Sequence, residues 1–396
     1  MNIQFSPPDI SQMEIDEVVD TLKSGWITTG PKTKKFEKQI ANYVNTNSAV
    51  CLNSATAAME MSLRYLGIGP GDEVITTPYT YSASASVITH VGAKVVMVDI
   101  AEEGFEMDYE KLAEAITPNT KAIIPVDIGG VPCDYERIIE ILESKKSIFK
   151  IENEIQERVG RVAVVADAAH SFGAKYKDKH VAEWADLTCY SFHAVKNLTT
   201  AEGGAVTWRR GLFEDEEAYQ EFQLLSLHGQ NKDALAKMQL GAWEYDIVAP
   251  NYKCNMTDIM AALGIAQLKR YPELLERRFE IIDKFNSAFE GSIVKPMLHK
   301  TEDKTGTGHL YIVNLEGYKE NDRNCVIVEM AERGIATNVH YKPLPMHTAY
   351  KNLGFDIRYY PNAYNRYENA MTLPLHTLLS DMDVDFIITT LLDIVK

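Results

Sequence analysis

Long apolar runs, paired cysteines and metal-binding histidine patterns are all missing from this chain of 396 residues. Without a run of ~18 or more apolar residues, the sequence predicts no membrane-spanning helix, and we expect no membrane partner. The five cysteines lie far apart and form no Cys-x-x-Cys pair, which argues against a disulfide framework or a zinc site and favours a reducing cytoplasm. The ten histidines show no spacing such as His-Glu-x-x-His, so no bound metal is expected. Residues 1–5 do not form a charged and then apolar leader, which agrees with a cytoplasmic location.

The chain also has fewer basic than acidic residues. Lysine and arginine total 40 against 56 aspartate and glutamate residues, which gives a formal net charge of −16. A chain this acidic repels a nucleic-acid backbone, and no basic cluster relieves the repulsion. We therefore expect no nucleic-acid partner, and an anionic substrate would need local hydrogen-bond donors.

Short apolar runs alternate with helical patterns over the first two-thirds of the chain, which is typical of a parallel β-sheet wrapped by helices. A chain of 396 residues exceeds the ~250–300 at which one core stops growing. We therefore expect a large domain over residues 1–270 and a smaller C-terminal α+β domain over residues 271–396. The expected strands are 49–52, 73–76, 94–98, 122–126 and 161–166, with helices over 108–116 and 135–142.

The rest of the chain is less regular. Residues 143–161 are charged and weakly periodic, so we interpret them as an insertion with a short helix of its own. A long helix over 271–289 should bridge the two domains. The small domain should then contain a mobile polar loop at 302–308, strands at 309–315 and 337–340, and a helix at 324–333.

Lys196 says most about function. It lies among hydroxyl and glycine residues, where enzymes present an amine to a carbonyl cofactor. By residue type alone, a surface lysine is the commoner interpretation. Asp167 changes the balance because it follows the buried apolar run 161–166, and open α/β sheets bind ligands at the carboxyl ends of their strands. A carboxylate there can pair with a protonated pyridine nitrogen, with capping of the next turn as the alternative.

Several motifs along the chain resemble one enzyme family, the DegT/DnrJ/EryC1/StrS sugar aminotransferases. They are DAAHSFGA (167–174), SFHAVKN (191–197) and EGGA (202–205), together with GWITTGP (25–31), NSATAA (53–58), YKCNMTDI (252–259) and NVHY (338–341). The resemblance implies an α/β fold of the aspartate aminotransferase-like type, fold type I, with a mainly parallel sheet in its large domain. It also implies pyridoxal 5'-phosphate (PLP) as cofactor, with pyridoxamine phosphate (PMP) as its second form.

The resemblance assigns a role to each motif. Lys196 would bond to the cofactor and then move a proton, while Asp167 would keep the ring nitrogen protonated. The other cofactor contacts implied are Thr56, Ala57 and Ser191 at the phosphate, Tyr81 stacked on the ring, and His170 at the ring's oxygen or face. A helix N-terminus suits the phosphate, although by residue type Ser54 is equally an ordinary N-cap. Likewise, Tyr81 alone would be interpreted as a core residue and His170 as a structural one.

Asn255 is implied to reach the neighbouring subunit's cofactor phosphate, so that the active site is complete only in a homodimer. Isologous two-fold dimers are also the commonest assembly. Asn251 is a second candidate, because it stands where the family often has glycine, and Cys254 replaces a frequent aromatic residue. The residues in segments that touch substrate in relatives are Thr29, Gly30, His309 and Tyr341. A plain turn at Gly30 and the end of a strand at Tyr341 are the alternatives.

The resemblance therefore implies an aminotransferase that uses glutamate to aminate a nucleotide-linked 4-keto-6-deoxy sugar, for surface polysaccharide, lipopolysaccharide or glycan synthesis. UDP-linked N-acetylated hexoses are the first expectation, followed by dTDP and GDP sugars. One alternative is a sugar dehydratase of the same fold, in which histidine typically replaces the lysine. The other is a non-catalytic regulator, which would lose Lys196 or Asp167. The presence of both residues favours the aminotransferase.

Overall fold

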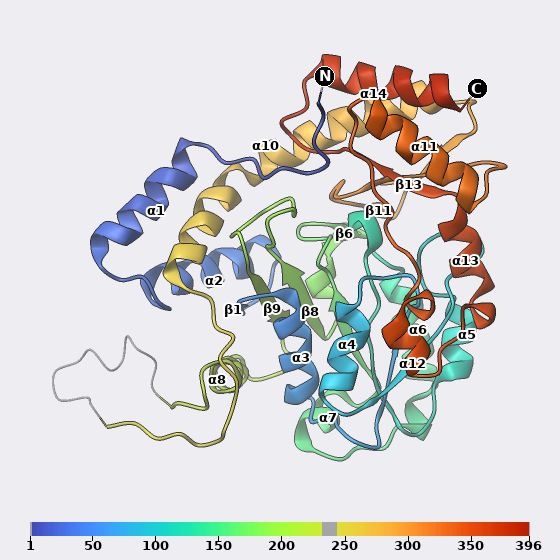
Figure 1. Ribbon diagram of the computed structural model, residues 1–396. Coiled ribbons are helices and arrows are strands. Elements are labelled where there is room, and N and C mark those ends of the chain that lie inside the picture. Colours follow the sequence, from blue (N-terminus) through green and yellow to red (C-terminus); the bar gives the residue numbers. More distant parts are fainter. Residues whose placement is uncertain (1, 232–243, 396) are drawn as a thin grey trace.

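The computed structural model describes residues 2–231 and 244–395, and its centre is a seven-stranded, mostly parallel β-sheet (Figure 1). The strand order is β1-β9-β8-β5-β4-β2-β3, and β9 alone runs antiparallel to its two neighbours within this sheet. The bounds are β1 (Ala49–Leu52), β2 (Glu73–Thr76), β3 (Lys94–Met97), β4 (Thr120–Ile123), β5 (Ala163–Asp167), β8 (Leu187–Ser191) and β9 (Gly204–Trp208). The predicted fold class is confirmed.

Each central strand has apolar residues on both faces, which explains why helices cover both faces of the sheet. Along β5, Ala163 and Val165 pack into one core and Val164 and Ala166 into the other, as period-two alternation requires. The first core holds α3 (Ala55–Tyr65), α4 (Ala83–His90) and α8 (Asp215–Ser226). The second holds α2 (Pro31–Tyr43), α5 (Tyr109–Ala115), α6 (Tyr135–Ser144) and the first turns of α10 (Asp258–Phe289).

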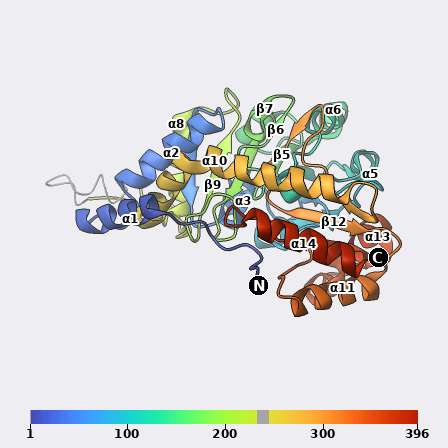
Figure 2. The same ribbon diagram turned by 90° about the horizontal axis from the view of Figure 1, so that it is seen from above.

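A smaller unit with a core of its own follows along α10. Its sheet has the order β10-β12-β13 and consists of β10 (Val294–Pro296), β12 (Tyr311–Leu315) and β13 (Ala370–Leu373). Helices α11 (Glu320–Glu332) and α14 (Asp381–Ile394) pack on it, and α10 lies beside α14 when seen from above (Figure 2). The predicted division at residues 270 and 271 stays a prediction, since α10 runs unbroken across it.

The N-terminal segment joins this smaller unit. Ile3 is buried in its core and pairs with Ile335, while α1 (Gln12–Ser24) packs on α10. The remaining α-helices and strands of the described residues are α7 (Glu154–Val159), β6 (Lys175–Tyr176), β7 (Lys179–His180), β11 (Lys304–Thr305), α12 (Thr348–Asn352) and α13 (Pro361–Glu368). Among the residues that the structure describes, no helix is both long and apolar enough to cross a bilayer.

The strand predicted at 122–126 is β4 at Thr120–Ile123, and the helix predicted at 324–333 is α11 at Glu320–Glu332. Three other predictions are wrong in kind or by more than a turn. The bridging helix begins at Asp258 rather than residue 271, because Thr257 caps it and Pro272 is accommodated inside it. Residues 337–340 form no strand, and only Asn338 bridges to the sheet, at Thr372. The segment 302–308, predicted as a mobile polar loop, contains the short strand β11, which pairs with β6 of the large unit.

Candidate active site

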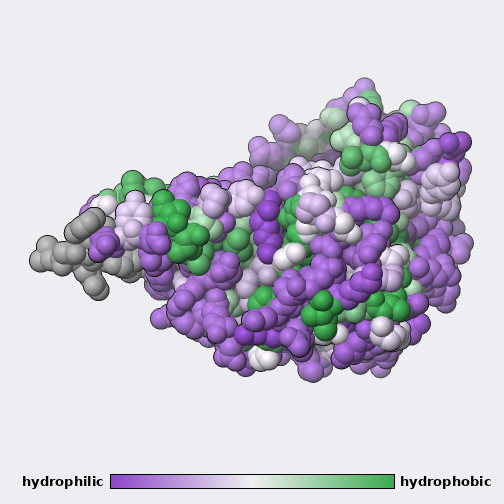
Figure 3. Space-filling view, turned by 90° about the horizontal axis from the view of Figure 1, so that it is seen from below, coloured by the Kyte–Doolittle hydropathy of each residue, from purple (hydrophilic) through white to green (hydrophobic). Residues whose placement is uncertain are grey.

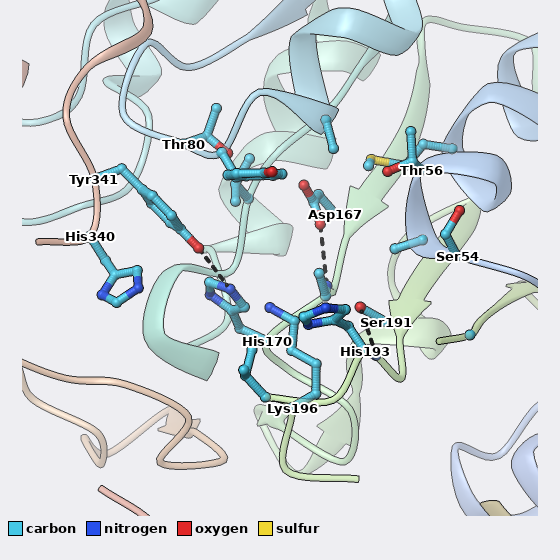
Figure 4. Close-up of a pocket in the computed structure, with 18 of the residues that line it drawn as sticks. Ser54, Thr56, Thr80, Asp167, His170, Ser191, His193, Lys196, His340 and Tyr341 are labelled. Carbon is cyan, nitrogen blue, oxygen red and sulfur yellow. Dashed lines mark hydrogen bonds between the residues drawn. The ribbon is translucent and has the colours of Figure 1, made fainter. Parts of the chain in front are cut away.

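A cavity of about 450 Å³ opens where β1, β5 and β8 end (Figure 4). β9 is antiparallel to both β1 and β8, so β1 runs parallel to β8, and the carboxyl ends of all three strands meet at one edge of the sheet. This is where open α/β sheets bind ligands. The predicted site residues that line the cavity are Thr56, Tyr81, Asp167, His170, Ser191, Lys196 and Tyr341.

Asp167 ends β5 with its carboxylate in the cavity and only 5% of its surface exposed. Ser84 Oγ donates to Oδ2 at 2.6 Å, and the Ala169 N–H donates to Oδ1 at 3.2 Å. Burial raises the pKa of Asp167, while these two bonds and the Lys196 charge oppose the rise. A cation placed against this carboxylate would hold it ionised, as a protonated pyridine nitrogen does.

The Lys196 amine faces the same cavity. Burial lowers its pKa to about 8, against the opposing attraction of Asp167. An ordinary lysine has a pKa of about 10.4, so far more of this amine is neutral and nucleophilic near neutral pH. The surface-lysine interpretation is wrong for a side chain in this setting.

His170 lies beside Lys196 with a fixed hydrogen position. The Gly129 N–H donates to its Nδ1 at 3.3 Å, so the ring carries its hydrogen on Nε2, which lies 3.2 Å from the Tyr341 hydroxyl. Burial, together with the charge of Lys196, lowers the pKa of His170 well below its usual value. The ring is therefore a neutral donor at the cavity wall.

An anion cradle lies at the start of α3. Thr56 and Ser191 both line the cavity, and Ser54 caps the helix by accepting from the Ala57 N–H at 3.1 Å. The N-cap interpretation of Ser54 is thus confirmed, and Ala57 must share its N–H if it also binds the phosphate. A Cβ built on Gly204 would lie 2.3 Å from the Ser54 carbonyl carbon, so glycine lets β9 close against this turn.

The remaining predicted residues lie elsewhere. Asn255 Nδ2 bonds to Thr29 Oγ1, and the Gly30 N–H donates to Asp258 at 2.8 Å, so these three residues form a cluster outside the cavity. His309 stands behind the cavity wall, with Nε2 3.5 Å from Lys196 Nζ. Asn251 Nδ2 donates to the Leu224 carbonyl at 3.2 Å and does not line the cavity either.

Tyr81 borders the cavity with 64% of its surface exposed, so the interpretation of it as a core residue is wrong. Two further residues were missed by the sequence analysis. Ser84 has no signal of its own, because its contact with Asp167 depends on how α4 packs over β5. His340 lies in the quoted segment 338–341, and burial together with the Lys196 charge lowers its pKa to about 4.

These features fit PLP and define the class of protein. A nucleophilic lysine, a buried strand-end carboxylate and a helix N-terminus surround one cavity of an α/β fold, which is the arrangement of a PLP-dependent transferase. Residues 8–392 match the DegT/DnrJ/EryC1/StrS aminotransferase family, and the chain belongs to this family.

Individual relatives agree over their whole lengths. The chain is 39% identical over 400 residues to the spore coat polysaccharide biosynthesis protein SpsC of Bacillus subtilis, covering 100% of this chain and 97% of SpsC. Spr1654 of Streptococcus pneumoniae, assigned as a sugar aminotransferase, is 58% identical in its PMP form, with a TM-score of 0.97 over 100% of this chain and 99% of that one. Its PLP form has a TM-score of 0.96 at 56% identity, covering 100% of this chain and 99% of that one.

A more distant structure has the same architecture. Helicobacter pylori PseC, an aminotransferase involved in the biosynthesis of pseudoaminic acid, is 25% identical, with a TM-score of 0.85 over 100% of this chain and 99% of that one. The predicted enzyme class, a PLP-dependent sugar aminotransferase, and the predicted cofactor are confirmed.

Proposed function

We propose that this enzyme moves the amino group of glutamate to the keto carbon of a nucleotide-linked 4-keto-6-deoxy sugar. The observation that carries the amino-transfer chemistry is the Lys196 amine, whose pKa is lowered to about 8 in a cavity that also contains Asp167. The sugar acceptor is supported by family membership. The named role of SpsC in polysaccharide biosynthesis and that of PseC in pseudoaminic acid biosynthesis support a pathway to surface polysaccharide, lipopolysaccharide or other glycans.

The residues at the cavity divide the work in this proposal. Asp167 binds the ring nitrogen and Tyr81 and His170 contact the ring, while Thr56, Ala57 and Ser191 hold the phosphate. When bound, PLP supplies the electron-withdrawing ring that makes a neighbouring C–H acidic. With PLP bound, Lys196 would hold its aldehyde carbon through Nζ, give it up to the incoming amine, and then take up a proton at Nζ and return it.

The size and position of the cavity suit the cofactor together with the sugar ring, with the nucleotide outside it. A volume of about 450 Å³ lies at the lower end of the ~300–1,000 Å³ typical of ligand pockets. His193 is exposed at the cavity and is available to the rest of the substrate. A UDP-linked N-acetylated hexose is our first candidate, with dTDP and GDP sugars next. Of the four predicted substrate residues, Tyr341 lines this cavity and is the first candidate for contact with the sugar, whereas Thr29, Gly30 and His309 lie outside it and stay predictions.

We also propose that the enzyme is a cytoplasmic homodimer with shared active sites. Exposed apolar residues gather on α1 and beside the Asn255 cluster, and Figure 3 shows green side chains on this projecting part of the molecule. They are Ile15, Val19 and Leu22 on α1, Ile27 shortly after it, and Ile247 and Val248 a few residues before Asn255. Burying such a face against a second copy would stabilise the dimer and place Asn255 near the partner's phosphate.

An absorbance titration with L-glutamate tests the amino-transfer proposal. The yellow band of PLP bound to Lys196 should fall as glutamate is added, while the band of PMP rises. Adding a UDP-linked 4-keto sugar should then restore the yellow band. A yellow protein indifferent to glutamate would reject this donor, and a protein that stayed colourless with added PLP would revive the non-catalytic alternative.

A further inference from the structure

One buried histidine lies within hydrogen-bonding distance of the Lys196 amine. His309 Nε2 is 3.5 Å from Lys196 Nζ, and His309 is 5% exposed in the loop before β12. No other side-chain hydrogen bond involves this amine within residues 2–231 and 244–395. The state of His309 therefore bears directly on the proton that Lys196 must move.

Asn197 fixes the hydrogen on the His309 ring. Asn197 Nδ2 donates to the Thr307 carbonyl at 2.8 Å, which leaves Asn197 Oδ1 as an acceptor 2.9 Å from His309 Nδ1. Nδ1 must then carry the hydrogen, and Nε2 turns a bare lone pair towards Lys196. Burial, with smaller contributions from nearby positive groups, lowers the pKa of His309 well below its usual value, so the ring stays neutral.

The backbone of Gly129, in the large unit, holds both histidines in place. The Gly129 carbonyl accepts from the His309 N–H at 3.0 Å, while the Gly129 N–H donates to His170. The two imidazole rings, with centroids 4.4 Å apart, therefore carry their hydrogens on opposite nitrogens. Of the two rings, His309 is the one that offers a lone pair to Lys196.

Other titratable groups face the same amine. They are Asp167 at the end of β5, His170 after it, His340 and Tyr341 from the C-terminal segment, and His193 and Glu202 from the segment of Lys196 itself. Asp167 attracts the charged amine, whereas the histidines with lowered pKa values are neutral. His309 is therefore the neutral group whose hydrogen bond favours the charged form.

We propose that His309, oriented by Asn197, is a positioning residue that accepts a hydrogen bond from the protonated Lys196 amine. The proton leaves the carbon that bears the donor's nitrogen, rests on Nζ against the His309 lone pair, and is delivered from Nζ to the cofactor carbon. His309 itself neither gains nor loses a proton. The inference rests on the Lys196 role proposed above and does not depend on which donor or sugar is used.

The test measures Lys196 directly in the protein freed of PLP. Cyanate reacts only with the neutral amine, so the extent of carbamylation of the Lys196 peptide, followed by mass spectrometry across pH, gives its midpoint. His309→Leu should lower this midpoint by about one unit, because the charged amine loses its acceptor. His309→Gln, whose amide oxygen can accept in the same place, should keep the midpoint near that of the unaltered protein. His299→Leu removes another buried imidazole of the smaller unit and should change nothing.

Asn197→Ala provides a second route if His309→Leu does not fold. Freeing the His309 ring should also lower the midpoint, because the ring can then turn an N–H towards Lys196. Unchanged midpoints in both folded variants, or no recovery in His309→Gln, would overturn the proposal. Failure of PLP to protect Lys196 from cyanate would instead reject the proposed function while leaving the midpoint comparison valid.

Discussion

At the scale of single residues, the lowered pKa of Lys196 sets the pH at which the enzyme can take up PLP. Below pH 8 the amine is mostly protonated and cannot attack an aldehyde, and above it the neutral form predominates. The rate at which the PLP-free protein turns yellow should therefore rise through about pH 8 and then level off. Stopped-flow absorbance measures this rate. A rise that continued beyond pH 10 would show an ordinary lysine.

Removal of the Lys196 side chain separates chemistry from folding. Lys196→Ala should fold and keep its dimer, because Lys196 Nζ makes no ion pair in the described structure, but it should lose turnover by at least the ~10²–10⁴-fold of a lost acid–base group. Circular dichroism, light scattering and a transamination assay test the three statements. Full activity in this variant would remove the basis of the proposed mechanism.

Ser84, which was not predicted as a site residue, donates a hydrogen bond to the Asp167 carboxylate. Ser84→Ala deletes the 2.6 Å hydrogen bond to Oδ2, which raises the pKa of Asp167 further and weakens its hold on a protonated ring nitrogen. A hydrogen bond to a charged group contributes ~1.5–3 kcal/mol, so PLP should bind roughly ten-fold or more weakly. Equilibrium titration with PLP measures the loss. Ser86→Ala on the same helix removes a hydroxyl that donates to the Ala83 carbonyl, its one hydrogen-bond partner among the described residues, and should bind PLP normally.

At the scale of elements, β9 depends on a glycine where it meets α3. In Gly204→Ala the new Cβ would lie 2.3 Å from the Ser54 carbonyl carbon and 2.5 Å from the Ala55 nitrogen, so strand and helix must separate. Such overpacking costs ~1–3 kcal/mol of unfolding free energy and should also loosen the phosphate cradle. Denaturant unfolding and PLP retention report on the two effects. Gly69→Ala, whose Cβ would meet nothing closer than 3.8 Å, is the matched control.

Elements with a strong local pattern were predictable from the sequence. The continuous apolar run Ala49–Leu52 gave β1 its bounds, because a strand buried on both faces needs no alternation. β2 was also predicted with its observed bounds, from the β-branched pair Val74 and Ile75. The first turns of α10 escaped prediction, since small buried residues such as Ala261 and Gly264 give little periodic signal and Pro272 suggests a break. The pairing of β11 with β6 joins segments far apart in the chain, so no local pattern could indicate it.

The residues of the site also fall into those that the sequence could predict and those that it could not. Lys196 and Asp167 could be predicted because each stands in a recognisable segment. Ser84 and Gly129 act only through contacts that tertiary packing creates. The placement of Asn255 outside the cavity of its own chain agrees with the expected contribution to a partner, which stays a prediction.

At the scale of the whole molecule, shared active sites make a quantitative prediction for hybrid dimers. Lys196→Ala and Asn255→Ala subunits, coexpressed with different tags, should form dimers in which one site has both an intact Lys196 and a partner's intact Asn255. Random pairing of two inactive variants then restores about one quarter of full activity. The assay uses a PLP concentration that saturates the unaltered enzyme but not Asn255→Ala. Separately expressed proteins that are mixed without exchange should show no recovery, and inactive hybrids would place Asn255 outside the partner's site.

The pairing of Ile3 with Ile335 also has a consequence for how the chain is made. Ile3 is synthesised long before the other residues of its core, which lie between Ile281 and Val395. Ile3 must therefore remain without its native contacts until the segment around Ile335 has been synthesised. The core of the smaller unit therefore closes later in synthesis than the seven-stranded sheet can form.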